Sequence, residues 1–217
     1  MKALPRNLET GLQLLERGHY ISSRGKIRTG RLPKIVLDLF RRLDREEIEW
    51  VLVGAEGINL YLKRPRATVD VDIVVRKKHL AKARKILKDV GTGLNDAEVR
   101  MKATLSGEPN SLEVDVIKSQ SHPLFERALD SRVLLDGVPT PSVEALLALK
   151  FLSAVSPWRL EEDKHQDVSD FIRCFKDNKD QIDRAALVQL ASLAHKNAAK
   201  EFPAFLEAVE NDRPIAI

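Results

Sequence analysis

One stretch decides the fold: Thr68-Val69-Asp70-Val71-Asp72-Ile73-Val74-Val75. Its β-branched residues and its alternation of polar and apolar positions predict a β-strand. Because successive side chains of a strand point to opposite faces, Asp70 and Asp72 share one face and lie close together. Val71 and Ile73 point to the other face, where helices can pack. The stretch therefore predicts a strand that carries a carboxylate pair on one side of a sheet.

Two carboxylates this close repel each other unless a cation lies between them. Oxygen-rich pairs favour Mg²⁺ or Mn²⁺, which keep some of their waters and also bind substrate phosphates. A second acidic strand follows at Leu112–Ile117, where Glu113 and Asp115 again share a face. A carboxylate from this second strand would complete a two-metal site. The alternative interpretation is the solvated face of an edge strand, which also carries such pairs.

The elements around these strands are predicted from periodicity and from turn residues. Upstream, apolar residues at helical spacing follow Pro33, and a short strand at Glu49–Val53 ends at Gly54. Ser106–Asn110 forms a turn between two strands, so that these strands form a hairpin. The predicted helices are 33–43, 55–62, 77–89, 142–155, 162–177, 180–196 and 199–210. The predicted strands are 49–53, 68–75, 99–105 and 112–117, with a further short strand before the Asp136-Gly137 turn.

The hairpin excludes a doubly wound parallel sheet, because that sheet needs crossover connections throughout. We predict an α+β fold, with a small mixed β-sheet flanked by helices and a C-terminal helical bundle. Pro139 and Pro141 mark a boundary. Residues 1–140, including an N-terminal helical extension, form the predicted catalytic domain, and residues 141–217 form the helical domain.

Composition narrows the class of protein. The 217 residues are 43% hydrophobic and 31% charged, which is typical of a globular protein and excludes general disorder. The net charge of +4 is compatible with an anionic ligand. The single cysteine, Cys174, excludes an internal disulfide framework and favours a cytoplasmic location. No targeting segment or membrane-spanning stretch is evident in the sequence.

Four separated motifs carry a family resemblance. Val53-Gly54-Ala55, the segment Arg66–Asp72 and the later strand carboxylate together resemble the polymerase-β-type nucleotidyltransferase superfamily. Pro141–Lys150 and Asp163–Asp170 are similar to the lysine and aspartate motifs of the AbiEii/AbiGii-type toxin nucleotidyltransferases. The resemblance covers about residues 33–177.

This resemblance implies a Mg²⁺- or Mn²⁺-dependent nucleotidyltransferase. Such an enzyme moves a nucleoside monophosphate from a nucleoside triphosphate to an acceptor hydroxyl on RNA, protein or a small molecule. The toxin branch further implies an antitoxin partner and no membrane. By resemblance, the metal ligands are Asp70, Asp72 and Asp115. The nucleotide-binding residues are Gly54, Ala55, Arg66, Thr68 and Lys150, and the catalytic residues are Asp70, Asp72, Lys150 and Asp167.

Two positions have more than one interpretation. Lys150 interrupts an apolar helical stripe, so that it either lays its stem over apolar surface or directs its ammonium at a triphosphate, and we favour the second. Asp163, Asp167 and Asp170 share one helix face, and either Asp167 or Asp170 is the family's second carboxylate. It would act as a base or position the incoming hydroxyl.

One departure from the family pattern leaves a second function open. Ala55 replaces the Gly or Ser that follows the motif glycine in the family, so that no hydroxyl contacts the phosphate there. The alternative is a catalytically inactive binding or regulatory module with the same fold. A basic run near the N-terminus favours a nucleic-acid acceptor over a small molecule. It contains Arg24, Lys26, Arg28, Arg31 and Lys34.

Overall fold

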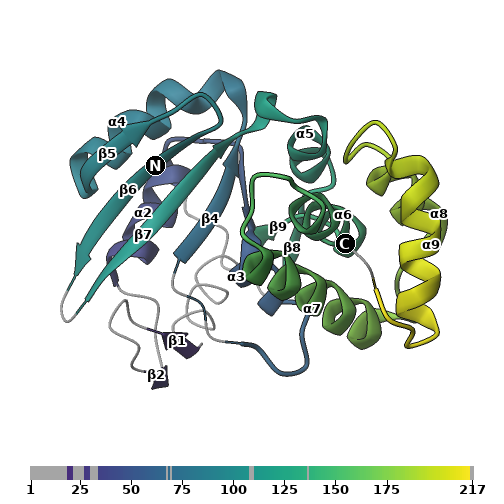
Figure 1. The fold of residues 1–217 in the computed structure, drawn as a ribbon. Coiled ribbons are helices and arrows are strands. Elements are labelled where there is room, and N and C mark those ends of the chain that lie inside the picture. Colours follow the sequence, from purple (N-terminus) through teal and green to yellow (C-terminus); the bar gives the residue numbers. More distant parts are fainter. Residues whose placement is uncertain are drawn as a thin grey trace.

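A five-stranded mixed sheet forms the centre of the computed structural model (Figure 1). The structure describes residues 19–21, 27–29, 34–66, 68, 70–107, 110–135 and 137–215. The strand order is β3-β4-β7-β6-β5, and only β4 and β7 run parallel. The strands are β3 (Trp50–Val53), β4 (Asp70–Val75), β5 (Thr92–Asp96), β6 (Arg100–Gly107) and β7 (Asn110–Lys118). The predicted α+β fold with a mixed sheet is confirmed.

One face of the sheet is covered by two helices, α2 (Lys34–Arg45) and α4 (Leu80–Val90). Val71, Ile73 and Val75 of β4 are fully buried in this layer. Complete burial stabilises each such side chain by roughly 1.5–3 kcal/mol relative to exposure. The alternation of β4 therefore fixes its register, since a slip by one residue would bury its aspartates in this apolar layer.

The opposite face packs on α3 (Gly54–Asn59), α5 (Pro123–Asp130) and α6 (Val143–Ala154). α7 (Glu161–Asn178) follows α6, and α8 (Arg184–Ala191) and α9 (Ala198–Glu210) lie farthest from the sheet (Figure 1). A single apolar cluster joins Val51 and Val74 of the sheet to Leu147, Phe171 and Phe202 of these helices. The core therefore extends across the proposed boundary at residue 140, and the division into two domains stays a prediction.

Several element boundaries differ from the prediction. The helix predicted over 180–196 spans only Arg184–Ala191, because Asp183 caps its start by accepting hydrogen bonds from the N–H groups of Ala185 and Ala186. The helix predicted over 55–62 begins at Gly54 and ends at Asn59. Ser142 caps α6 as predicted, since its hydroxyl accepts from the Ala145 N–H at 3.3 Å.

Four strands outside the central sheet form two pairs. They are β1 (His19–Ile21) with β2 (Ile27–Thr29), and β8 (Val133–Leu135) with β9 (Val138–Thr140). Most of the predicted N-terminal helical extension lies outside the described residues, as do Arg24, Lys26 and Arg31 of the basic run. In the part of the chain that is described, no helix has both the length and the apolar character needed to cross a membrane.

Candidate active site

The site begins where β3 ends at Gly54. This residue has φ +62°, a backbone conformation that glycine adopts without the steric cost of a Cβ. A Cβ at this position would lie 2.0 Å from Asp72 Oδ2, because Asp72 is paired with Val53 on the adjacent strand. The backbone at Gly54 therefore packs directly against the Asp72 carboxylate, and the motif glycine is needed for both its conformation and its size.

The carboxylates of β4 and β7 lie side by side. In the parallel register Asp72 is opposite Asp115, and Asp70 is opposite Glu113. Residues paired in this way point to the same face of a sheet, as the two acidic strands predicted. Thr68 is buried and donates a hydrogen bond of 2.9 Å from its hydroxyl to Asp70 Oδ1, which orients that carboxylate.

Asp115 is buried and engaged by a cation. Its Oδ2 lies 2.8 Å from Nη1 of Arg100, while its Oδ1 is buried without a hydrogen-bond partner. Burial raises the pKa of Asp115, although Arg100 and Lys102 act in the opposite direction. Asp115 is therefore partly neutralised by protein groups.

Among the carboxyl groups of the site, that of Asp72 has its pKa raised most. Burial raises the pKa of its carboxyl far above the usual range, and the negative charges of Asp70 and Asp115 raise it further. Lys150 and Arg159 of the helical half act in the opposite direction. The three carboxylates thus form an anionic cluster that nearby basic residues compensate in part and that a bound cation would neutralise further.

A cationic group comes from the helical half. Lys150 on α6 is buried, and its Nζ donates hydrogen bonds of 2.8 Å to Asp167 Oδ1 and Asp170 Oδ2 on α7. Nε of Arg159 lies 3.0 Å from Asp167 Oδ2. The Lys150 ammonium is therefore held at a fixed position by two carboxylates, and it does not extend to solvent along an apolar surface.

Arg66 joins this helical group to the sheet half. Its guanidinium donates to both oxygens of Asp170, at 2.7 and 2.8 Å, and its backbone pairs with the Asn59 side chain at 2.9 Å in both directions. Burial works to raise the pKa of Asp170, but Arg66 and Lys150 outweigh it and lower that pKa. Asp170 is therefore a fully buried anchor between the two halves.

Many of these groups surround one cavity of about 950 Å³, but Asp115 and Asp170 are not among the residues that line it. Eight of the predicted site residues line it: Gly54, Ala55, Arg66, Thr68, Asp70, Asp72, Lys150 and Asp167. Of the two carboxylates left open by the sequence, Asp167 lines the cavity, whereas Asp170 is fully buried. The carboxylate pair and the cationic group thus face one shared space, which can hold a ligand with a polyanionic part.

A family model for the AbiEii toxin nucleotidyl transferase of type IV toxin–antitoxin systems matches residues 38–215. The chain belongs to the AbiEii nucleotidyltransferase family. No curated protein matches it significantly.

Two solved structures show the fold that the chain shares. The solution structure of the antibiotic-resistance factor ANT(2″)-Ia has a TM-score of 0.54 at 14% identity, covering 83% of this chain and 97% of that one. The crystal structure of ANT(2″)-Ia with adenylyl-2″-tobramycin has a TM-score of 0.53 at 14% identity, covering 73% of this chain and 97% of that one.

A nucleotidyltransferase of this fold is expected to use a divalent metal. Among the described residues, no group of three or more His, Cys, Asp or Glu side chains is placed to hold a metal ion. The predicted three-ligand set of Asp70, Asp72 and Asp115 therefore stays a prediction. Asp70 and Asp72 alone fit Mg²⁺, which is usually bound by one or two carboxylates together with waters and substrate phosphates.

The cavity residues that the sequence interpretation of this AbiEii chain missed include Arg100, Trp158 and Arg159. Arg100 and Arg159 pair with carboxylates of other elements, so that no local pattern reveals their partners. In the sequence, the basic character of these two arginines was the only indication of a role at the site. Trp158 precedes Arg159 between the two recognised helical motifs, and its place in that gap could have singled it out.

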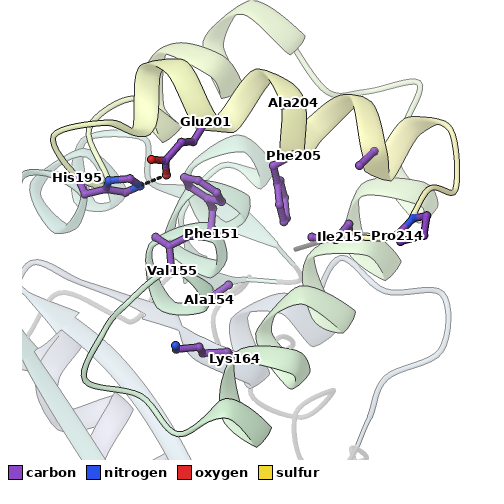
Figure 2. Close-up of a pocket in the computed structure, with 11 residues that line it drawn as sticks. Phe151, Ala154, Val155, Lys164, His195, Glu201, Ala204, Phe205, Pro214 and Ile215 are labelled. Atoms are coloured by element: carbon purple, nitrogen blue, oxygen red, sulfur yellow. Dashed lines mark ion pairs between the residues drawn. The ribbon is translucent and has the colours of Figure 1, made fainter. Parts of the chain in front are cut away.

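A second cavity of about 540 Å³ lies in the helical half, between α6, α9 and the C-terminal segment (Figure 2). Its walls are mainly apolar, including Phe151, Val155 and Phe205. Its polar groups are few, with Lys164 at one end and a His195–Glu201 ion pair at the other (Figure 2). Among the described residues, Glu201 supplies its only lining carboxylate, so that this cavity has no counterpart of the Asp70–Asp72 pair that lines the first one.

Proposed function

We propose that this protein transfers a nucleoside monophosphate from a nucleoside triphosphate, bound with Mg²⁺ or Mn²⁺, to an acceptor hydroxyl. One observation carries the proposal: Asp70 and Asp72 share a cavity of about 950 Å³ with Lys150, Arg66 and Arg159. The carboxylates suit a hard cation and the basic groups suit a triphosphate. The same observation disfavours an inactive binding module, because the carboxylate pair serves no evident structural purpose.

In this proposal the acceptor oxygen forms a bond to the α-phosphorus, and the bond from that phosphorus to the bridging oxygen of the β-phosphate breaks. Pyrophosphate leaves with the negative charge, and the acceptor hydroxyl passes its proton to solvent water. When bound, a metal ion held by Asp70 and Asp72 would supply Lewis-acid polarisation of the phosphoryl oxygens. Lys150 and Arg159 stabilise the charge that develops on pyrophosphate.

Asp167 positions these cations and the acceptor hydroxyl. Its Oδ1 accepts from Lys150, whereas its Oδ2 lies beside Arg159 but has no hydrogen-bond partner. This oxygen can accept a hydrogen bond from the incoming hydroxyl once Arg159, whose side chain is 43% exposed, turns to a phosphate. Because both of its oxygens lie beside basic groups, we assign Asp167 a positioning role.

The test is transfer of label from each α-³²P nucleoside triphosphate, with Mg²⁺, to the RNA, protein and small-molecule fractions of a cell extract. We expect one fraction to be labelled by the wild-type protein and none by Asp72→Asn, because a hard cation loses a charged ligand. The labelled fraction identifies the acceptor. Equal labelling by the wild-type protein and this variant would contradict the proposal.

The family also supports a toxin role, with transfer as the toxic activity and an antitoxin as the partner. Expression of the wild-type chain should then arrest growth, whereas Asp72→Asn at the same protein level should not. Growth arrest by both proteins would mean that toxicity does not depend on nucleotidyl transfer.

A further inference from the structure

Trp158 is an exposed indole at the rim of the candidate site. It lies in the turn between α6 and α7, and the residue is 92% exposed, the highest value among the large apolar residues in the part of the chain that is described. It also lines the first cavity. A tryptophan this exposed leaves a large apolar ring in water, although aromatic side chains contribute most when they are covered. A ligand in the cavity would cover it.

The turn holds this ring next to the cationic group. The N–H of Ser156 donates to the Ser153 carbonyl at 3.2 Å, and the N–H of Arg159 donates to the Ser156 carbonyl at 3.4 Å. Arg159 in turn lies 3.0 Å from Asp167, which also accepts from Lys150. The indole is thus one residue away from a cation proposed to contact the triphosphate, but itself lies on the exposed rim.

We propose that Trp158 stacks on the base of the bound nucleoside triphosphate. This inference rests on the proposed function and names how the base is held. When the phosphates contact Lys150 and Arg159, the base is the planar part of the ligand that can reach Trp158 at the rim of the cavity. Stacking on an aromatic ring uses the face of a base and no hydrogen-bonding edge, so that it accepts every base. Purines should bind more tightly than pyrimidines because their ring face is larger.

Tryptophan fluorescence measures this contact directly. The protein has two tryptophans, and Trp50 is completely buried and stacked on Phe40 at 4.7 Å between ring centroids, so that acrylamide quenches mainly Trp158. With Mg²⁺ present, ATP should protect the emission from acrylamide. Inorganic tripolyphosphate, which has no base, should bind without protecting it. Equal acrylamide quenching with and without saturating ATP would overturn the proposal.

A second experiment measures the binding of ATP and tripolyphosphate to variants of this turn by calorimetry. Trp158→Ala should weaken ATP binding about tenfold, within the range of a lost stacking contact, and leave tripolyphosphate binding unchanged. Trp158→Phe should recover most of the affinity. Leu160→Ala is the matched control, since Leu160 is 66% exposed in the same turn and is not among the cavity-lining residues.

The outcomes separate this inference from the proposed function. If Trp158→Ala binds ATP as tightly as the wild-type protein, the stacking role is wrong and the transferase proposal stands. If that variant keeps its ATP affinity but loses transfer, the ring belongs to the acceptor and the inference is equally wrong. If the wild-type protein binds neither ATP nor tripolyphosphate, both proposals fail.

Discussion

The absence of a side chain at Gly54 leaves the space that the Asp72 carboxylate occupies. Gly54→Ala should abolish transfer and lower the stability by about 1–2 kcal/mol, because a methyl group at positive φ is strained and would meet Asp72 Oδ2 at 2.0 Å. The measurements are turnover and the thermal midpoint. Gly93→Ala is the control, since Gly93 has φ +64° but no atom within 4 Å of the added Cβ. Gly93→Ala should lose stability but keep its turnover. Equal loss of turnover in both variants would contradict this role of Gly54.

Asp72 should destabilise the metal-free protein. Burial raises the pKa of its carboxyl and the neighbouring acids raise it further, so that ionisation is costly in the folded state. Asp72→Asn should therefore raise the thermal midpoint without metal, by an amount equivalent to about 1 kcal/mol, and should remove the stabilisation that Mg²⁺ gives to the wild-type protein. Thermal unfolding with and without Mg²⁺ tests this. A variant that Mg²⁺ stabilises as much as the wild-type protein would show that the metal binds elsewhere.

The pairing of α6 with α7 depends on a buried charge. Lys150→Met leaves Asp167 and Asp170 short of a cation, and removal of one partner from a buried pair costs about 3 kcal/mol. We expect this loss in chemical denaturation, together with loss of transfer. Adding Asp167→Asn should recover part of the stability but no transfer. Recovery of transfer in the double variant would show that the lysine only balances charge.

Lys164→Met on α7 is the matched control for this pair. Lys164 faces the second cavity and pairs with Glu161, whose side chain is 70% exposed. An ion pair with such an exposed partner contributes little, so that stability and transfer should both be nearly unchanged. A loss as large as that of Lys150→Met would mean that any lysine on this helix pair matters equally.

The elements that the sequence predicted well are those with a strong local pattern. The alternation of β4 placed Asp70 and Asp72 on one face, and Ser142 marked the start of α6. β5 was missed because it is an exposed edge strand that contains Gly93 at positive φ. α5 was missed because it is short, although Pro123 in its first turn, after the cap residue His122, is a known start signal.

Contacts between distant segments are what local patterns could not predict. Arg66 and Asp170 are 104 residues apart, and nothing in the sequence around either residue indicates that the other is its partner. The sequence singled out both residues by family resemblance, but only the fold shows that they bind each other. The choice between Asp167 and Asp170 follows from the same geometry, because the buried anchor and the cavity carboxylate lie one helical turn apart.

The sheet half and the helical half share one core, and this has a consequence for unfolding. Val51 and Val74 of the sheet pack in the same cluster as Leu147 and Phe171 of the helices. Polar contacts also cross the proposed boundary, including the Tyr61 hydroxyl, which donates to the Pro141 carbonyl at 2.8 Å. Neither half can bury its apolar face alone, so that we expect both to unfold in one cooperative transition.

Two probes follow this transition in the Trp158→Phe protein, where Trp50 is the sole tryptophan. Trp50 fluorescence reports the sheet and far-ultraviolet circular dichroism reports mainly the helices, and their denaturation midpoints should coincide. Arg66→Ala should lower both midpoints equally, because its pair with Asp170 links the halves. Arg184→Ala, which breaks an equally bidentate but exposed pair with Glu210 inside the helical half, should change them little. Separate transitions, with Arg66→Ala shifting only one of them, would establish residues 1–140 and 141–217 as independent domains.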